Sequence, residues 1–278
     1  MDAWKDGKLY LSNELMVSAY DHGFLYGLGF FETFRTYNGK VFLWEAHWNR
    51  LLSALEDYHI TIPYQKEQIL TAVEKLTKSN NNEDGYFRLN ISAGIHDIGL
   101  QPTYYENPTV ILYRKALPAV SRGKEKSAVW LQTVRNSPES SIRHKSHHYA
   151  NNVQARFEVE SLASQEGFFL TADGNVAEGI TSNIFWVKDG KLYTPSLETG
   201  ILAGTTRGWV CSIMDVEQGC FPKDALETAD EVFITNAVQE IVPINRLGEI
   251  RFMGNQGPVY IALHEAYIAC IQEERTEG

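Results

Sequence analysis

Hydrophobic and polar positions along the chain follow two periods, one typical of helices and one typical of strands. Apolar residues recur at three- and four-residue steps over residues 44–58, which predicts an amphipathic helix. Further helical patterns occur over residues 69–76, 153–162, 204–214 and 258–272. Between them, β-branched and aromatic residues flank Asp-Gly or Asn-Gly pairs at 6–7, 38–39, 173–174 and 189–190. These pairs tolerate the positive φ of a tight hairpin, so the pattern predicts an α+β fold with antiparallel strands rather than a doubly wound parallel sheet.

One segment has the composition of a boundary between domains. Residues 117–127 combine Pro, Gly and charged side chains shortly after the apolar strand pattern of residues 109–113. We therefore expect an N-terminal domain over residues 1–116, a linker over residues 117–127 and a C-terminal domain over residues 128–278.

Composition and charge narrow the class of protein. The chain of 278 residues is 44% apolar and 12% aromatic, which supports packed cores and excludes a disordered chain. Its formal net charge of −10 comes without a basic stripe, so no nucleic-acid partner is expected. Charges, Gly or Asn break every apolar run, and the N-terminus lacks the apolar core of a signal peptide, so neither membrane insertion nor secretion is expected. Three cysteines without CxxC spacing fit reduced thiols, which predicts a cytoplasmic protein.

The densest polar cluster of the sequence lies at residues 142–152 and contains His144, Lys145, His147 and His148. A zinc site needs ligands that converge, and the adjacent His147 and His148 would diverge, so no metal is expected. Lys145 is a candidate nucleophile, because polar neighbours and partial burial can lower the pKa of a lysine. The alternative for Lys145 is an ordinary solvated surface lysine.

Two glycine-containing turns are candidates for binding a phosphate or a dinucleotide. Residues 200–207 form a Gly-bracketed turn that enters a helix, where N–H groups and the hydroxyls of Thr205 and Thr206 can hold a phosphate. This turn has no lysine at the P-loop position, which excludes a nucleoside triphosphate site. Residues 26–30 lack the third glycine of a dinucleotide fingerprint and do not predict such a site. Taken alone, each of these segments is better explained as a plain turn.

Six short segments are informative together because of the order and spacing in which they occur along the chain. They are residues 31–35 (Phe-Glu-Thr-Phe-Arg), 47–51 (His-Trp-Asn-Arg-Leu), 145–146 (Lys-Ser), 178–185 (Glu-Gly-Ile-Thr-Ser-Asn-Ile-Phe), 200–207 and 233–237 (Phe-Ile-Thr-Asn-Ala). In this order the chain resembles the fold-type IV enzymes that depend on pyridoxal 5'-phosphate (PLP), which include branched-chain and D-amino acid aminotransferases and aminodeoxychorismate lyases. The resemblance implies a smaller N-terminal α/β domain and a larger C-terminal PLP-binding domain with antiparallel β layers. It also implies a homodimer with its active site at a domain or subunit interface.

The resemblance implies roles for individual residues as well. Lys145 would form a Schiff base with PLP and then shuttle protons, and Glu178 would face the pyridine nitrogen and keep it protonated. Arg50 would bind the phosphate as a planar fork. The other groups implied in phosphate binding are Thr205, Thr206 and the backbone N–H groups of Asn236 and Ala237. Outside the family order, Arg50 would be an exposed helix residue and Glu178 an acid in a turn.

Ala237 distinguishes two branches of this family. Aminotransferases usually have a threonine there, whose hydroxyl contacts the phosphate, whereas the Thr-Asn-Ala form resembles the lyase branch, as do residues 88–94 and 145–149. The resemblance therefore implies that a small molecule, 4-amino-4-deoxychorismate, is converted to 4-aminobenzoate and pyruvate in folate biosynthesis. The alternative is an aminotransferase acting on D-amino or branched-chain amino acids. A PLP-binding protein without catalysis is disfavoured, because Lys145 and Glu178 are both present.

The implied substrate carries two carboxylates, so an acidic protein needs local positive charge to bind it. By family position, Arg35 and Arg88 are the candidate substrate-binding residues, with His147 or His148 as a helper. Either arginine has an alternative role as the partner of a structural ion pair.

Overall fold

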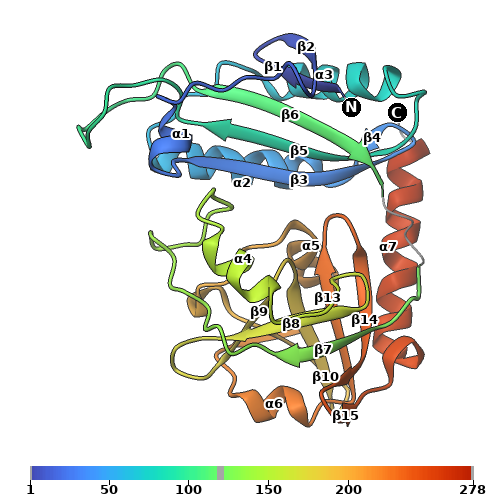
Figure 1. The fold of residues 1–278 in the computed structure, drawn as a ribbon. Helices are drawn as coiled ribbons and strands as arrows, with labels where there is room; N and C mark the ends of the chain where they lie inside the picture. The colour runs from blue at the N-terminus through green and yellow to red at the C-terminus, as the bar shows by residue number, and fades with distance from the viewer. Residues whose placement is uncertain (1, 118–121, 277–278) are drawn as a thin grey trace. The chain divides into compact units, whose positions relative to one another are not determined.

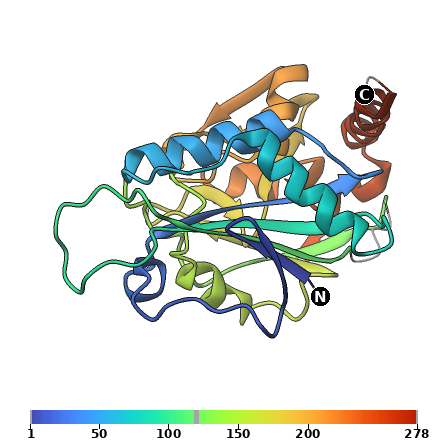
Figure 2. The same ribbon diagram turned by 90° about the horizontal axis from the view of Figure 1, so that it is seen from above.

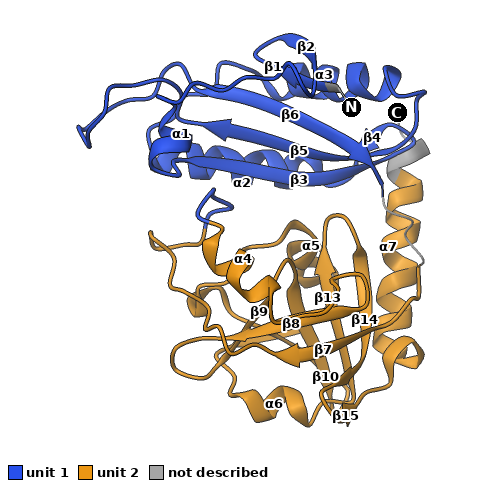
Figure 3. Ribbon diagram, in the orientation of Figure 1, with its two compact units in different colours: residues 1–119, 144–148, 274–278 blue, residues 120–143, 149–273 orange. Residues whose placement is uncertain are grey.

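The computed structural model describes residues 2–117 and 122–276, and the chain divides into two compact units (Figure 3). Unit 1 comprises residues 1–119, 144–148 and 274–278, and unit 2 comprises residues 120–143 and 149–273. The segment 144–148 therefore belongs to the unit that is built mainly from N-terminal residues. Residues 118–121 of the predicted linker lie outside the described residues, and the domain limits given above stay a prediction.

Unit 1 contains, within its described residues, a six-stranded antiparallel sheet with the strand order β2-β1-β6-β5-β3-β4 (Figure 1). Its strands are β1 (Asp2–Lys5), β2 (Lys8–Leu11), β3 (Gly29–Tyr37), β4 (Lys40–Val41), β5 (Gly85–Ser92) and β6 (Thr109–Ala116). Helices α2 (Trp44–Asp57) and α3 (Lys66–Lys78) pack against one face of the sheet (Figure 2), and the short α1 (His22–Leu25) precedes β3.

Helix α2 lies where the apolar pattern of the sequence predicts a helix. Trp44, Trp48, Leu51 and Leu55 recur at three- and four-residue steps, and all four side chains are buried in the core of unit 1. This apolar stripe matches the 3.6-residue period of a helix that covers a sheet. The predicted helix over residues 44–58 is confirmed.

Strand β5 separates the core of unit 1 from the opposite face of its sheet. Leu89 and Ile91 are fully buried in the core, whereas Arg88 and Asn90 are half-buried. Successive side chains of a strand point to opposite faces. Arg88 and Asn90 therefore lie on the face turned away from α2 and α3, where the candidate substrate-binding groups of unit 1 gather.

Unit 2 contains, in its described part, a nine-stranded sheet with the order β12-β11-β10-β13-β14-β7-β8-β9, and β15 pairs with β14. Its strands are β7 (Lys126–Trp130), β8 (Gln165–Leu170), β9 (Val176–Gly179), β10 (Asn183–Lys188), β11 (Lys191–Pro195), β12 (Val216–Gly219), β13 (Glu231–Asn236), β14 (Glu240–Leu247) and β15 (Ile250–Arg251). Its helices are α4 (Ala150–Arg156), α5 (Thr205–Ile213), α6 (Lys223–Glu227) and α7 (Pro258–Thr276), with 3-10 turns η1 (Leu197–Thr199) and η2 (Gly254–Gln256). Phe168 and Phe169 of β8 are both fully buried, in different apolar clusters, so this sheet is covered on both faces.

The sheet of unit 2 is mixed, although the sequence predicted antiparallel layers. Strand β7 pairs in parallel with both β14 and β8, and β11 pairs in parallel with β12. The other pairs of this sheet are antiparallel, as the hairpin signals predict. Parallel neighbours need long connections, which carry no local turn signal in the sequence.

Three of the four predicted glycine turns close hairpins with both central residues at positive φ. They are Asp6-Gly7 (φ 45° and 93°), Asn38-Gly39 (53° and 81°) and Asp189-Gly190 (49° and 76°), and they connect β1 to β2, β3 to β4 and β10 to β11. These values suit the mirror-image turns that match the twist of a hairpin. At 173–174, Gly174 alone has a positive φ, of 81°, in the connection from β8 to β9.

The helix predicted over residues 153–162 is wrong in its extent. The observed α4 covers Ala150–Arg156, and turns follow it. The prediction took Val153 and Phe157 as buried positions, but their side chains are 54% and 87% exposed. Elsewhere in the described part of the chain, no helix has the length and apolar character needed to cross a bilayer.

Candidate active site

Backbone pairing with β3 fixes the position of Lys145 in unit 1. The Phe31 N–H donates to the Lys145 carbonyl at 2.9 Å, and the His147 N–H donates to the Gly29 carbonyl at 2.9 Å. Phe30 and Ser146 form an antiparallel bridge between these two bonds. The Lys145 Nζ lies 4.6 Å from the centre of the Phe31 ring. The segment therefore acts as a short extra strand that presents Lys145 beside Phe31.

Arg50 is oriented by a buried carboxylate. Arg50, on α2, donates from Nε (2.8 Å) and Nη2 (2.6 Å) to the two oxygens of Glu32, on β3. His47, one turn earlier on α2, donates from Nδ1 to Glu32 at 2.6 Å. Burial by itself would raise the pKa of Glu32, but the Arg50 charge and the hydrogen bonds from His47 and Arg50 outweigh it and lower that pKa to about 2. Glu32 is therefore an anion that holds one edge of the Arg50 fork, a role that the sequence did not predict.

Arg88 and His147 converge on the amide of Asn90. The Arg88 guanidinium carbon lies 3.5 Å from the centre of the Phe31 ring, and its Nε and Nη2 each donate to Asn90 Oδ1 at 3.3 Å. The His147 Nε2 lies 2.9 Å from the same oxygen. Burial, followed by the nearby Arg88 charge, lowers the pKa of His147 to about 4, so the ring is neutral at pH 7. The structure thus brings Arg88, His147 and Lys145 to one ring, that of Phe31.

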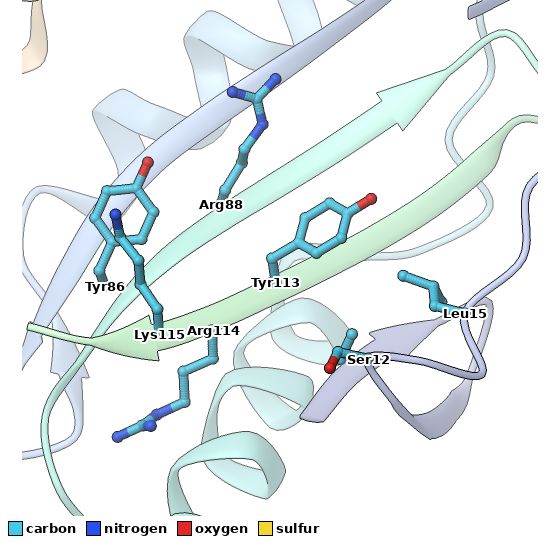
Figure 4. Close-up of a pocket in the computed structure, with 8 residues that line it drawn as sticks. Ser12, Leu15, Tyr86, Arg88, Tyr113, Arg114 and Lys115 are labelled. Atoms are coloured by element: carbon cyan, nitrogen blue, oxygen red, sulfur yellow. The ribbon is translucent and has the colours of Figure 1, made fainter. Parts of the chain in front are cut away.

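Arg35 does not join this cluster. It lies four residues from Phe31 along β3, about 13 Å at the usual rise of a strand, and its guanidinium carbon lies 4.5 Å from the centre of the Tyr37 ring. Beside the cluster, β5 and β6 form the floor of a cavity of about 270 Å³ (Figure 4). The lining residues of this face are Tyr86, Arg88, Tyr113 and Lys115, and Arg114 points to the opposite face.

In unit 2, Glu178 is buried at the end of β9 between two arginines. Arg135 donates from Nε (2.8 Å) and is paired through Nη2 (2.7 Å) with Glu178 Oε1, and the Leu202 N–H donates to Oε2 at 3.0 Å. Arg143 Nε lies 3.8 Å from Oε1 and also donates to the Gly200 carbonyl. Burial, and then the charge of Arg135, lowers the pKa of Arg143 to about 10. Arg135 is the strongest partner of Glu178, and no motif in the sequence pointed to it.

The start of α5 has the groups that bind an anion. Thr205 and Thr206 are buried in its first turn, where backbone N–H groups have no partner within the helix. Within the described part of the chain, the buried Thr206 Oγ1 has no hydrogen-bond partner. A Cβ on Gly204 would lie 2.0 Å from Asn183 Oδ1, so this turn needs glycine. Asn183 in turn donates to the Leu202 carbonyl at 2.9 Å and holds the loop that contacts Glu178.

Asn236 and Ala237 begin the turn from β13 to β14. The Asn236 side chain accepts the N–H groups of Val238 (3.0 Å) and Gln239 (2.7 Å), so its oxygen is used to close this turn. Any contact of this segment with a phosphate would then come from backbone N–H groups, as the sequence predicted. That contact stays a prediction.

The groups present fit pyridoxal phosphate chemically. Unit 1 contains Lys145, an amine that can react with the aldehyde, and Arg50, a cation that can bind the phosphate. A carboxylate for the pyridine nitrogen and a helix start with an unpaired hydroxyl come from unit 2, in Glu178 and Thr206. Among the described residues, no three His, Cys, Asp or Glu side chains are grouped so as to hold a metal ion.

Comparisons with known proteins find relatives that match nearly the whole length of the chain. The family model of amino-transferase class IV matches residues 29–247. The chain is 43% identical over 269 residues to the aminodeoxychorismate lyase of Bacillus subtilis, covering 94% of this chain and 92% of that one. It is 30% identical over 286 residues to the branched-chain-amino-acid aminotransferase of Pseudomonas aeruginosa, with coverages of 95% and 91%. A branched-chain aminotransferase of the archaeon Thermoproteus uzoniensis, solved with norvaline, has a TM-score of 0.88 and 28% identity over 100% of this chain and 96% of that one. The chain belongs to the class IV aminotransferase family.

Proposed function

We propose that this protein is a PLP-dependent carbon–oxygen lyase that converts 4-amino-4-deoxychorismate to 4-aminobenzoate and pyruvate in folate biosynthesis. The observation that carries the proposal is the 43% identity to the Bacillus subtilis lyase over nearly the whole length of both chains. The retained Lys145 and Glu178 and the alanine at position 237 support it. When bound, PLP supplies an electron sink for the electron pair that the substrate releases.

In this proposal each residue has one task in holding the cofactor. With PLP bound, Lys145 Nζ would hold the aldehyde carbon, and Glu178 would keep the pyridine nitrogen protonated. Arg50, whose guanidinium group Glu32 orients, would bind the phosphate. The further phosphate-binding groups are Thr205, Thr206 and the backbone N–H groups of Asn236 and Ala237.

Lys145 also moves protons. The Lys145 Nζ would be the base that removes the proton from C4 of the substrate. The bond between the ring and the enolpyruvyl oxygen then breaks, and the enolpyruvyl group takes up a proton and leaves as pyruvate. The six-membered ring becomes aromatic in this step, which drives the reaction forward.

Two arginines are proposed to bind the dianionic substrate. Arg88 and Lys145 both lie against the Phe31 ring, and His147 lies beside Arg88. Arg88 is the proposed ligand of one carboxylate. Arg35, farther along β3, is the proposed ligand of the other. Charge-assisted hydrogen bonds of this kind contribute about 1.5–3 kcal/mol each to binding.

The first prediction concerns the products. The purified enzyme, with PLP and 4-amino-4-deoxychorismate, should form 4-aminobenzoate and pyruvate in equal amounts without any added keto acid, because a lyase regains its starting state in every turnover. Chromatography measures 4-aminobenzoate, and a lactate dehydrogenase coupling measures pyruvate.

The alternative, an aminotransferase, is favoured by the 30% identity to the Pseudomonas aeruginosa enzyme. It would show itself as rapid conversion of the cofactor to its amine form by D-alanine or leucine, reversed by a keto acid, with no 4-aminobenzoate formed. That result would replace the lyase assignment.

We further propose a homodimer, located in the cytoplasm, as the working form. Unit 1 exposes large apolar side chains on residues 16–25 and 95–104, among them Met16, Phe24 and Leu100, which are 74%, 74% and 83% exposed. Hydrogen bonds anchor this surface, since the Gly99 N–H donates to the Tyr26 hydroxyl at 2.7 Å. Exposed apolar patches of this kind typically mark protein interfaces. The odd number of cysteines, three, fits the reduced thiols of a cytoplasmic protein.

The second prediction is that sedimentation equilibrium gives twice the chain mass of 31.5 kDa. Replacing Leu100 and Phe24 with aspartate should shift the protein toward the single chain, because a buried interface does not tolerate unpaired carboxylates. A wild-type mass of one chain at micromolar concentration would refute the dimer.

A further inference from the structure

Asn90 links Arg88, the proposed ligand of a substrate carboxylate, to the neighbouring ring of His147. Its side-chain oxygen accepts both Nε and Nη2 of Arg88 at 3.3 Å and lies 2.9 Å from His147 Nε2. Asn90 and Arg88 are alternate residues of β5, so both side chains stand on the same face of the sheet. No motif singled out Asn90 as a functional residue.

The chemistry of the donors fixes the orientation of this amide and the tautomer of the histidine. A guanidinium has only donors, so the Asn90 atom that faces Arg88 must be its oxygen. The same oxygen faces His147 Nε2, which must therefore carry a hydrogen and donate it. In the neutral ring, Nδ1 is then the acceptor.

Glycine at position 29 makes room for this histidine ring. A Cβ on Gly29 would lie 2.3 Å from His147 Cε1 and 2.5 Å from its Nδ1. The His147 N–H also donates to the Gly29 carbonyl at 2.9 Å. The ring is thus held on one side by Asn90 and on the other by the backbone of β3.

Arg88, His147 and Asn90 together carry one positive charge at neutral pH, that of Arg88. Burial and the Arg88 charge keep the pKa of His147 at about 4; the Asp21 charge acts in the opposite direction, and that of His148 adds to the lowering. An aspartate at position 90 would keep the shape and both contacts, but its charge would offset that of Arg88. The side chain that links these two groups therefore has to be neutral if the Arg88 charge is to attract an anion.

We propose that Asn90 is a positioning residue for substrate binding: it holds Arg88 over Phe31 and His147 in its Nε2–H form without adding a charge. This inference rests on the proposed lyase function, in which Arg88, with His147 beside it, binds a carboxylate of the substrate. Asn90 itself touches neither substrate nor cofactor in this role.

The test is Asn90→Asp in the full-length holoenzyme, by kinetics and by NMR of the His147 ring. We expect KM for 4-amino-4-deoxychorismate to rise at least about tenfold at pH 8 while kcat changes by less than about threefold. The pKa of His147 should rise from about 4 by about one unit or more, because an opposite charge at hydrogen-bond distance favours the imidazolium. Below that new pKa the imidazolium restores the lost charge, so KM of the variant should fall again as the pH is lowered. The wild-type KM should not show this step.

Matched variants separate charge from shape. Asn81→Asp makes the same change on an exposed loop of unit 1 and should alter neither KM nor the His147 pKa. Asn90→Ala removes the oxygen without adding a charge and should raise KM several-fold at every pH, without the step. Arg88→Ala and Arg35→Ala measure how far KM rises when a whole cation is removed. Arg251→Ala, at an exposed site in unit 2, should leave KM unchanged.

Two results would overturn the inference while leaving the lyase function intact. One is an Asn90→Asp enzyme with a wild-type KM at pH 8, and the other is a His147 pKa that does not move in it. If the wild-type enzyme forms no 4-aminobenzoate, the proposed function fails instead. The NMR measurement would in that case still decide whether Asn90 holds His147.

Discussion

Replacing Lys145 with alanine is expected to lower the rate of 4-aminobenzoate formation at least about 10⁴-fold, because in the proposed function one amine both binds the cofactor and moves the proton. The fold should survive this change. Residues 145–147 pair with β3 through backbone groups, and the Phe31 N–H donates to the Lys145 carbonyl rather than to its side chain. Turnover by chromatography and the thermal midpoint of unfolding would measure the two effects separately.

Three controls make the Lys145 prediction specific. Lys78→Ala removes an exposed lysine of α3, whose side chain is 72% exposed, and should leave turnover unchanged. Added ethylamine should restore part of the activity of Lys145→Ala, because a free amine can replace the missing base. Borohydride reduction of the wild-type holoenzyme, followed by peptide mapping, should place the pyridoxyl group on Lys145. A label on another lysine, or a variant that keeps more than a tenth of wild-type turnover, would contradict the role.

Features of the fold that are set by neighbours in sequence could be predicted. Asn38-Gly39 and Asp189-Gly190 occupy hairpins because the left-handed backbone that such turns need is a property of those two residues alone. The period of α2 is likewise local. Strand β7 is different, because its parallel partners β14 and β8 follow it in sequence by more than thirty residues. No feature of the β7 sequence indicates which strands it pairs with.

The predicted extent of α4 is wrong because two apolar positions of the pattern are exposed. Val153 and Phe157 have the spacing of a buried helical stripe, yet both are exposed, and Phe157 lies beyond the end of the helix. A pattern of apolar positions indicates which side chains favour burial, but it does not indicate which part of the structure covers them. Within a single chain these two positions therefore remain uncovered.

The residues of the candidate site could be named from the family order, but their supporting partners could not. Arg50 reaches Glu32 across 18 residues, Glu178 reaches Arg135 across 43, and His147 reaches Asn90 across 57. Each of these pairs is made by the tertiary fold, and the sequence predicted no role for any of the three partners, although Glu32 and Asn90 lie within segments that carry the resemblance. Motifs identify the groups that do chemistry, whereas the groups that orient them emerge only from the packed structure.

Replacing Glu178 with glutamine should lower turnover by at least about a thousandfold while PLP stays bound. A neutral amide cannot hold the pyridine nitrogen in its protonated form, so the cofactor loses its capacity as an electron sink. The same change leaves the buried Arg135 without its anion. We expect the free energy of unfolding to fall by about 1.5–3 kcal/mol, the usual contribution of a hydrogen bond to a charged group. Kinetics, cofactor titration and denaturant unfolding of the holoenzyme would measure these quantities.

Glu166→Gln provides the matched control for Glu178→Gln, since both acids are buried in neighbouring strands of one sheet. Burial raises the pKa of Glu166, which favours the protonated acid that glutamine resembles. The Glu166 Oε1 accepts the Ile180 N–H at 3.0 Å, and a glutamine oxygen can keep that bond. We therefore expect near-normal turnover from Glu166→Gln and a large loss from Glu178→Gln. Equal losses in the two variants would mean that any buried amide in this sheet disables the enzyme, and near-normal turnover in Glu178→Gln would remove Glu178 from the site.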